Sequence, residues 1–551
     1  MRTAFIGLIL STVAEAALAQ QLPSAGGQLR QLPPATQTPR VIPELRVDRP
    51  APAAAAADAG PAFPVTTLAI TGMTVFSESE LRAITGFVPG VSVSLGDLNR
   101  MAAKITDFYA ARGYFVAQAY LPAQAVTGGT VTIAVIEGRY GAVTTNNSSR
   151  VADGVVAARL AGLDSGDIVA NRALERRLLL LSDLPGTLVK STLSPGAEVG
   201  TADLRVDVAP GRSVTGSIDA DNGGNRYTGY YRAGGSLNIN NPLGIGDVLS
   251  VRGLVSDGGL TYVRGAYQVP VGALTLGVAY ARLDYSLGKE FEALDAHGSA
   301  DIASVYASYP LLRTYDYNVY LLAAADFKFF HDEIDTTRSV IDRRSQVGSL
   351  GLSGDGRDTG GSSFWSIGWT YGNLDIRTPA VRAIDAVTAR SNGGFHKLNL
   401  AAGRNQNLTE NLSLYLYARG QLASKNLDIS EKMQLGGAYG VRAYPEGEGF
   451  GDQGYIVTAE ARLRLAGLSA AVPGDVALVA FVDHGGVTFN RNRFSPADNS
   501  TSLSGAGGGI TWAGNGDFQV RASYAHRLGS KRVTSGPDAS GQFWFQVSKL
   551  F

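Results

Sequence analysis

The second half of the chain, from about residue 212 onward, alternates apolar and polar residues with a period of two. LSLYLYARGQL (412–422) places leucines on one face and Ser, Tyr, Arg and Gln on the other. VTAEARLRL (457–465) and FQVRASYAHRL (518–528) follow the same rule. Since alternate side chains of a β-strand point to opposite faces, these segments are predicted strands. Half-buried strands of soluble sheets also alternate, so the period alone leaves the architecture open.

Three further features of this half indicate a membrane barrel. The polar faces are rich in arginine, as expected for a water-filled lumen. Short turns such as 241–247, 268–273, 309–315 and 470–475 interleave with long polar loops near 286–297, 330–342, 373–393, 423–454 and 485–505. The ending FWFQVSKLF brings Phe543, Phe545, Val547 and Phe551 onto one face. We therefore predict a C-terminal transmembrane antiparallel β-barrel over residues 212–551, with about sixteen strands and with fourteen or eighteen still open. A soluble β-sandwich or lectin-like array is the alternative.

The region before the barrel has the pattern of two small α/β modules, at residues 64–140 and 141–211. In the first, Leu98, Met101, Ile105, Phe108 and Tyr109 form one helical stripe that Gly113 ends, and VTTLAI, AQAYLP and TVTIAVIEG are predicted strands. In the second, VADGVVAARLAGL and NRALERRLLLLSDL are predicted helices, and LVKSTLSPG and TADLRVDVAPG a strand pair. Neither module contains a recognisable catalytic set, so we expect both to bind a partner.

The N-terminus predicts export from the cytoplasm. It has one positive charge, a short apolar stretch and the ending Ala17-Leu18-Ala19, which together indicate a signal peptide at residues 1–19. The apolar run is far shorter than the roughly 20 residues of a transmembrane helix. Residues 20–63 are rich in Pro, Ala and Gln and are predicted to be an N-terminal segment and linker, in which SAGGQLRQL (24–32) could form a helix that plugs the pore.

Composition argues against several other functions. Lys+Arg and Asp+Glu number 48 each, which leaves no basic footprint for nucleic acid. Cysteine is absent, so disulfides and thiol chemistry are excluded. The five histidines are dispersed without metal-ligand spacing, and the glycines at 449, 451 and 454 follow no buried parallel strand that a dinucleotide site would need. We expect no cofactor, no metal and no enzymatic activity.

Three short motifs resemble the POTRA–barrel superfamily, whose polypeptide-transport-associated (POTRA) modules precede an outer-membrane barrel. VRAY (441–444) is similar to the VRGY or VRGF loop signature, with Ala443 in place of the usual glycine. FVD (481–483) is similar to the F-x-D strand signature, and Phe551 to the terminal aromatic of the barrel-assembly signal. Two modules, together with 221–247 and 308–314, resemble the two-partner secretion transporters, the haemolysin and filamentous-haemagglutinin exporters.

This resemblance implies a site inside the barrel. The long loop 423–454 is expected to fold back into the lumen, where Arg442, flanked by Val441 and Tyr444, meets Asp483 of the F-x-D strand. Phe481 and Asp483 are two residues apart and share a face opposite Val476, Leu478, Ala480 and Val482, which places them inside. An arginine–carboxylate pair can be bidentate and directional. Glycines at 447, 449, 451 and 454 are expected to let the loop turn back.

The function that the resemblance implies is protein export. The POTRA modules would lie in the periplasm and capture an unfolded, large secreted partner, an adhesin, cytolysin or similar protein of β-helical fold, for export through the barrel. The expected location is the bacterial outer membrane, with its lipid and the barrel-assembly machinery as further partners. The alternatives are an insertase for other barrels and a passive porin.

Overall fold

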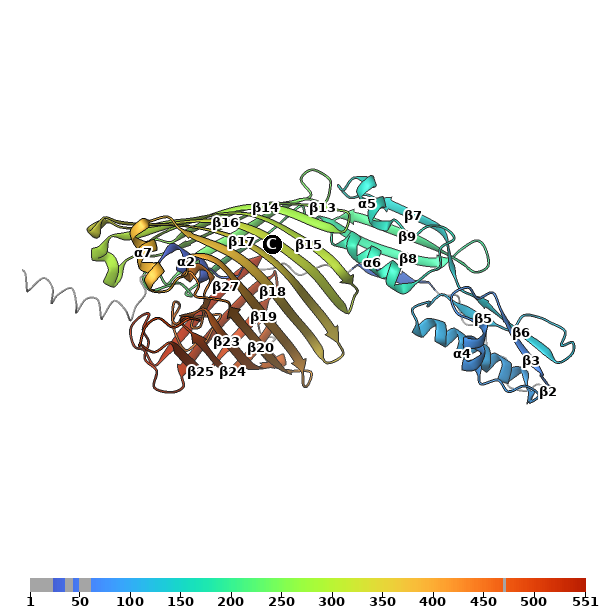
Figure 1. Cartoon of the computed structure of the whole chain (residues 1–551). Helices are drawn as coiled ribbons and strands as arrows, with labels where there is room; N and C mark the ends of the chain where they lie inside the picture. The colour runs from blue at the N-terminus through green and yellow to red at the C-terminus, as the bar shows by residue number, and fades with distance from the viewer. Residues whose placement is uncertain (1–22, 35–42, 49–60, 469–471) are drawn as a thin grey trace, which may run out of the picture.

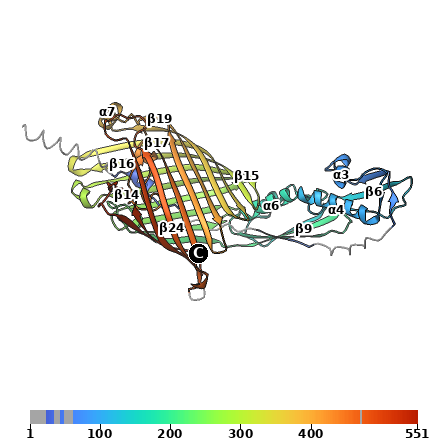
Figure 2. The ribbon, with the colours of Figure 1, turned by 90° about the horizontal axis from the view of Figure 1, so that it is seen from below.

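The computed structural model describes residues 23–34, 43–48, 61–468 and 472–551. The predicted signal peptide and most of the predicted linker lie outside these residues. A barrel forms one half of the molecule, and two α/β modules extend in a row from one of its ends (Figures 1 and 2). No helix within the described residues has the length and apolar character needed to span a membrane.

The barrel closes with sixteen strands, as predicted. Every strand pairs antiparallel with its neighbours, and β10 closes the cylinder against β27. Closure pairs the backbone groups that an open sheet edge would expose to hydrocarbon. The strands are β10 (Val214–Asp221), β11 (Arg232–Asn240), β12 (Val248–Ser256), β13 (Thr261–Val271), β14 (Leu274–Ser286), β15 (Ala296–Arg313), β16 (Tyr317–Ile334), β17 (Ser339–Asp358), β18 (Gly361–Ile376), β19 (Gly393–Asn407), β20 (Leu412–Ala423), β23 (Gln453–Arg464), β24 (Gly474–Thr488), β25 (Ser500–Gly514), β26 (Phe518–Arg527) and β27 (Gly541–Leu550).

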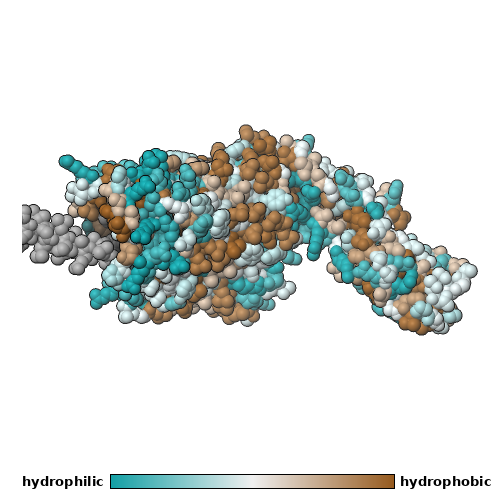
Figure 3. Space-filling view, viewed as in Figure 1, coloured by the Kyte–Doolittle hydropathy of each residue, from teal (hydrophilic) through white to brown (hydrophobic). Residues whose placement is uncertain are grey.

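The alternation of each strand separates an apolar outer wall from a polar lumen. On β24, Leu478 and Val482 are exposed on the outside, whereas Asp483 is fully buried inside. On β27, Phe543 and Phe545 face outward as predicted, and Phe551 follows them at the end of the chain. Apolar side chains gather on the visible outer wall, and hydrophilic ones gather toward the end farther from the modules (Figure 3). This is the distribution of a barrel that faces lipid.

Short turns and long loops alternate along the barrel, with one correction. The predicted long loop near 330–342 is wrong: β16 runs to Ile334 and β17 begins at Ser339, with only the 3-10 turn η2 (Asp335–Thr337) between them. Asp332 of this stretch is instead buried inside the barrel and paired with Arg343, the residue that follows the stretch. The other connections hold η1 (Lys289–Leu294), α7 (Pro379–Val387), η3 (Ile429–Glu431), β21 (Met433–Gln434), β22 (Phe450–Gly451) and η4 (Ala466–Leu468).

The first module has a three-stranded sheet covered by two helices. β3 pairs parallel with β6, and β5 pairs antiparallel with the other edge of β6. The predicted helical stripe lies on α4, where Leu98, Ile105 and Tyr109 are buried against the sheet. A capping box of Ser94 and Asp97 starts this helix. The elements are β2 (Phe63–Pro64), β3 (Thr67–Thr71), α3 (Glu78–Thr85), β4 (Ser92–Val93), α4 (Leu95–Ala111), β5 (Gln118–Tyr120) and β6 (Thr130–Ile136).

The second module repeats this plan and adds one strand from the N-terminal segment. Its sheet has the order β1-β8-β9-β7, and β1 pairs parallel with β8 at the edge that corresponds to β5 of the first module. This part of the predicted linker is therefore a paired strand, with Leu45 packed against the module's core. The elements are β1 (Glu44–Val47), β7 (Arg139–Asn147), α5 (Asp153–Leu160), α6 (Asn171–Ser182), β8 (Thr187–Pro195) and β9 (Thr201–Pro210).

Helix α6 fixes the second module to the barrel at the turn between β15 and β16. Arg313 donates two hydrogen bonds to Asp183, at 2.9 and 2.8 Å. Arg176 donates to the carbonyl of Pro310 at 3.0 Å, and the backbone amide of Tyr315 donates to Glu175. The second module is therefore docked on the barrel mouth through its own helix.

Candidate functional site in the barrel lumen

The connection between β20 and β23, residues 424–452, folds back into the lumen. The predicted site residues Val441, Arg442 and Tyr444 are all buried in it. Gly447 and Gly449 have φ of +85° and +67°, values that residues with a side chain rarely adopt. Glycine at these two positions therefore permits the predicted turn of the chain. Gly451 lies in the short strand β22 instead, where a Cβ atom would come within 2.5 Å of Val487 Cβ.

Arg442 lies at the centre of a buried charge cluster. Its Nε and Nη2 donate to the two oxygens of Asp483 at 2.8 and 2.9 Å, which makes the pair bidentate. Its Nη1 donates to Glu460 Oε2 at 2.8 Å. The exposed fractions are 8% for Arg442, 2% for Glu460 and 0% for Asp483. One guanidinium thus satisfies two carboxylates on the barrel wall, in a site that water hardly reaches.

Strand register explains why these wall groups converge. Glu460 of β23 pairs across the sheet with Phe481 of β24, and Thr458 pairs with Asp483. All four side chains therefore face the lumen as neighbours. Cζ of the Arg442 guanidinium lies over the Phe481 ring, 3.3 Å from the ring centroid. Thr458 donates to Asp483 at 2.9 Å. The wall offers Arg442 both carboxylates and an aromatic face.

The backbone around Arg442 is held as well. Its amide donates to Asp483 Oδ2 at 3.2 Å, and its carbonyl accepts from Trp544 Nε1 of β27 at 2.6 Å. Ala443 has no positive φ, so this position does not need the glycine that the family signature carries. Ala443 packs against Gly505, where any added Cβ would lie 2.4 Å from Ala443 Cβ.

Glu460 and Trp544 are the partners that sequence reasoning missed. Both lie at alternate positions that face the lumen, and Glu460 interrupts a polar face otherwise made of Thr458, Arg462 and Arg464. A lone acidic residue on a basic inward face was the available signal. Nothing in the sequence pairs Trp544 with a loop 102 residues earlier.

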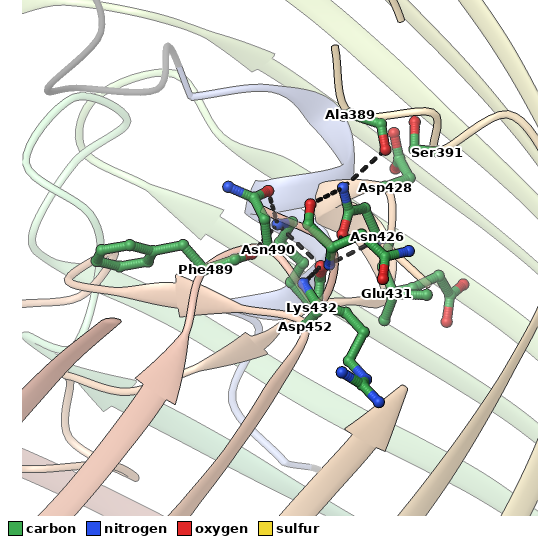
Figure 4. Close-up of polar contacts among 12 residues, drawn as sticks. Ala389, Ser391, Asn426, Asp428, Glu431, Lys432, Asp452, Phe489 and Asn490 are labelled. Atoms are coloured by element: carbon green, nitrogen blue, oxygen red, sulfur yellow. Dashed lines mark hydrogen bonds and ion pairs between the residues drawn. The ribbon is translucent and has the colours of Figure 1, made fainter. Parts of the chain in front are cut away.

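The base of the loop is held by three further ion-pair groups. Arg343 of β17 bridges Asp428 of the loop and Asp332 of β16, at 2.5 Å each. Glu431 accepts from the wall lysines Lys328 and Lys397, at 2.6 and 2.7 Å. Lys432 meets Asp452 at 3.0 Å, at the point where the chain leaves the loop for β23 (Figure 4).

Neighbouring connections contribute to the same region. Asn426 donates to the carbonyls of Ala389 and Asn492, in the connections before β19 and before β25 (Figure 4). Near the loop tip, the Glu448 carboxylate accepts from the backbone amides of Thr534 and Ser535, at 2.9 Å each. The loop is therefore tied to both sides of the lumen.

Helix α2 (Ala25–Arg30) is a second element inside the barrel, within the segment 24–32 for which a helix was predicted. The Ala25 amide donates to Asp332 at 2.8 Å, and Thr228 donates to Gln28 at 3.0 Å. Two wall arginines, Arg232 and Arg252, donate to the carbonyls of Gln31 and Pro33, at 3.0 and 2.7 Å.

The helix and the loop also touch each other directly. Arg30 donates to the carbonyl of Lys432 at 3.1 Å. Gly26 lies so close to η3 that a Cβ atom there would be 2.9 Å from Ser430 Cβ. Small residues thus allow α2 to pack on the loop while its other side packs on the wall of β14, β15 and β16. Helix and loop together occupy part of the lumen, and a cavity of about 660 Å³ remains beside Tyr439 of the loop and Pro34.

Two other features lie outside this cluster. Phe551 exchanges two backbone hydrogen bonds with Gly216 of β10, at 3.0 and 3.1 Å, next to the seam of the barrel.

The end of the barrel far from the modules has a small group of possible metal ligands: Asp295, His297 and Asp335, whose ligand-type atoms lie within 4.8 Å of one another. Two of these three are exposed, and no second observation at this group points to a metal.

The architecture defines the class first: an outer-membrane barrel with periplasmic α/β modules and a lumen that contains its own loop and helix. Residues 200–512 match the family described as haemolysin secretion/activation protein ShlB/FhaC/HecB, and residues 63–138 match the ShlB-type POTRA domain. The chain belongs to this family of outer-membrane two-partner secretion transporters, which export a partner protein, and its POTRA modules lie in the periplasm.

Relatives and solved structures agree with this assignment. The chain is 27% identical over 505 residues to the heme/hemopexin transporter protein HuxB of Haemophilus influenzae strain 86-028NP, covering 89% of this chain and 87% of that one. It is 24% identical to the outer membrane transporter CdiB of Dickeya dadantii, covering 88% and 85%. The structure of CdiB from Escherichia coli has the same fold, with a TM-score of 0.73 at 22% identity, covering 91% and 92%. These relatives are named as transporters.

Proposed function

We propose that the Arg442–Asp483–Glu460 cluster holds the transporter closed, and that an unfolded partner passes through the lumen after α2 and the loop have moved. The observation that carries this proposal is the bidentate, fully buried contact between Arg442 and Asp483, 41 residues apart, which ties the loop to the wall. Breaking such a contact leaves charges buried without partners, which keeps the loop in place at rest. Val441, Tyr444 and Phe481 pack around the cluster and exclude water from it.

We further propose that the POTRA modules capture the partner by strand addition, and that the first module supplies the edge. Among the described residues β5 pairs only with β6, so its other side has no strand beside it. The corresponding edge of the second module is covered by β1. An extended, unfolded chain can add to an open edge through backbone hydrogen bonds. Deleting β1 should then leave capture by the first module unchanged.

The cargo that fits this transporter is a large secreted protein of repetitive, β-helical fold, for which stepwise folding outside the cell biases movement outward. The HuxB relatives are named for heme/hemopexin, which makes a haem- or haemopexin-binding surface protein one of the cargoes to test. Phe551 is proposed as part of the signal that the barrel-assembly machinery reads during insertion. The residues proposed for these roles bind the partner or hold the loop in place. None of the proposed steps is a chemical reaction.

The test of the proposed function is deletion of the gene, followed by proteomics of the outer membrane and of the medium. We expect loss of one large surface or secreted protein, while other outer-membrane barrels keep their normal abundance. A general decrease of barrels would instead support the insertase alternative. Loss of small-solute uptake without loss of any protein would support a porin.

A further inference from the structure

A cavity of about 90 Å³ lies at the joint between the second module and the barrel. Arg159, at the end of α5, and Asp183, after α6, line it from the module. From the barrel, polar side chains at the strand ends line the opposite side: Gln268, Thr275, Ser308 and Tyr320. The cavity thus lies where an unfolded chain would pass from the modules to the pore.

The barrel residues of this cavity belong to the inner wall. Thr275 is on the same face of β14 as Ala281 and Leu283, which pack in the cluster around α2 inside the lumen. Gln268 lies on the same face of β13 as Tyr262, and Tyr320 lies on the same face of β16 as Phe330. Tyr262 and Phe330 belong to that cluster. Because the lipid-facing residues lie on the opposite face of each strand, these polar residues line the cavity from the lumen side, and Val269 of the opposite face also lines it.

Arg159 is buried in this cavity without a partner. Only 8% of it is exposed, yet among the described residues it has neither a hydrogen bond nor an ion pair. Asp183 is the nearby carboxylate, but Arg313 occupies both of its oxygens. Burial lowers the pKa of Arg159, and the attraction of Asp183 only partly opposes this effect. The guanidinium remains charged all the same.

Other buried arginines of the protein are paired, which makes Arg159 an exception. Arg232 meets Asp221 at 2.8 Å, and Arg442 meets two carboxylates. At the joint, Arg159 and Arg313 share Asp183, while Glu175 accepts from the Tyr315 amide and Asp355 accepts from Asn318, so Arg159 has no carboxylate of its own. The nitrogens of Arg159 reach the cavity and are free to bind a ligand, and a carboxylate is the group that a guanidinium binds best, through two parallel hydrogen bonds.

We propose that this cavity binds the side-chain carboxylate of an aspartate or glutamate in the exported partner as it moves from the POTRA modules into the pore. The inference rests on the proposed function, since it assigns the cavity to the cargo. A volume of about 90 Å³ exceeds the roughly 10–15 Å³ that one water molecule needs and so accommodates a carboxylate, which would bind Arg159 while the hydroxyls of Thr275 and Ser308 offer further hydrogen bonds. Arg159 would thus give the transporter a preference for acidic segments at the pore entrance.

The test uses the full-length protein in nanodiscs and two unstructured fluorescent peptides that are identical except for one central Glu or Gln. Fluorescence anisotropy should show about tenfold tighter binding of the Glu peptide, a difference of roughly 1.4 kcal/mol. The Arg159→Gln variant should lose this difference. Arg172→Gln is the matched control, because Arg172 is exposed on the same module, and it should keep the difference. Equal binding of both peptides to the unaltered protein, or a difference that survives Arg159→Gln, would overturn the proposal.

A second variant covers the case in which Arg159→Gln fails to fold. Thr275→Asp adds a carboxylate to the cavity wall and keeps the arginine, and it should also abolish the preference for Glu. A third arm exchanges phosphatidylcholine for phosphatidylglycerol in the nanodisc. Arg159-dependent retention of phosphatidylglycerol, without peptide discrimination, would assign the site to lipid and overturn the inference. If peptide discrimination is absent while gene deletion still removes one secreted protein, the inference fails and the proposed function stands.

Discussion

The lumen contains two inserted elements, the loop 424–452 and helix α2, and different kinds of contacts hold them. The loop contributes Asp428, Glu431 and Arg442, each in a buried ion pair with the barrel wall. Helix α2 contributes mainly backbone groups and an amide side chain, as at Gln28 and Gln31. In the ion pairs of the loop, both the loop and the wall contribute a charged group. In the contacts of α2 and its C-terminal flank with the wall, only the wall contributes charged groups.

This difference predicts which element leaves more easily. When α2 leaves, Asp332 keeps its ion pair with Arg343, and Arg232 keeps Asp221. The loss is then mostly hydrogen bonds between one charged and one neutral group, of about 1.5–3 kcal/mol each, and water or the remaining ion pair can satisfy the charged group afterwards. When the loop leaves, Asp483 loses Arg442 while Glu460 keeps Arg462 of the wall, and removing one partner of a buried pair costs roughly 3–5 kcal/mol. We therefore expect α2 to move first and the loop to move only under the load of cargo.

The largest effect is expected from Arg442→Ala, which removes the paired cation from buried Asp483 and one of two close cations from Glu460, which keeps Arg462 at 2.7 Å. The loop should lose roughly 3–5 kcal/mol of attachment, so that its released form becomes at least about a hundred times more populated. Trp544, which donates to the Arg442 carbonyl, provides a fluorescence reporter of this release. Arg404→Ala is the control, because Arg404 pairs with Asp358 at an exposed turn, where a pair contributes at most about 1 kcal/mol. Equal effects of the two substitutions would contradict the comparison.

A charge exchange between positions 442 and 483 needs a third change. Arg442→Asp with Asp483→Arg would place the new aspartate beside Glu460, which accepts from Arg442 at 2.8 Å. We expect the double variant to export poorly and the addition of Glu460→Gln to restore part of the export of the partner protein. Full rescue by the double variant alone would show that Glu460 is not coupled to the pair.

A smaller effect is expected from Glu460→Gln alone. Arg442 then keeps its bidentate bond to Asp483 and still has an amide oxygen at position 460, so the loss is about 1.5–3 kcal/mol, that of one hydrogen bond to a charged group. The midpoint of urea unfolding of the barrel should decrease by less than in Arg442→Ala. An equal or larger decrease would mean that Glu460, and not Asp483, is the main partner of Arg442.

The sequence was sufficient for the barrel and for part of the lumen cluster. Alternation placed Leu478 and Val482 outside and Asp483 inside, since the period of two leaves only these two faces. The motif resemblance brought Arg442 to Asp483. Glu460 was missed because alternation shows that a residue faces the lumen but not which inward group a distant loop will reach. The β1 strand was missed because four residues in a Pro- and Ala-rich segment pair with a strand 146 residues later, Glu44 opposite Lys190.

The contacts that hold α2 inside the barrel could not be predicted for the same reason, although a plug helix in this segment was expected. A pattern within SAGGQLRQL favours a helix, but its place depends on Asp332, Thr228 and Ser430, all far away in the chain. The predicted loop at 330–342 failed because its polar residues suggested solvent, whereas Asp332 is paired inside the barrel with Arg343. Polar residues of a barrel protein can lie either in loops that face the outside water or in the lumen. Composition does not distinguish these two places.

The helix side of the comparison is tested by Gly26→Leu. The added side chain collides with Ser430, since a Cβ atom alone would lie at 2.9 Å from its Cβ, and α2 should leave the lumen more often. Planar-bilayer recordings should show more frequent open events, while the unfolding midpoint stays close to that of the unaltered protein. Gly368→Ala is the control, because no atom lies within 4 Å of the added Cβ there. Unchanged recordings would mean that the loop alone closes the pore.

The smallest effect is expected from Thr228→Val, which removes one neutral hydrogen bond to Gln28 at 3.0 Å and leaves a side chain of similar size. Losing about 1 kcal/mol should raise the population of the released helix roughly fivefold, well below the change in Gly26→Leu. The same recordings measure it, with cargo export in cells expected to remain near normal because the loop keeps its ion pairs. If Thr228→Val opened the pore as strongly as Arg442→Ala, the helix would be the main closure, and the contrast between charged and neutral attachment would lose its physical basis.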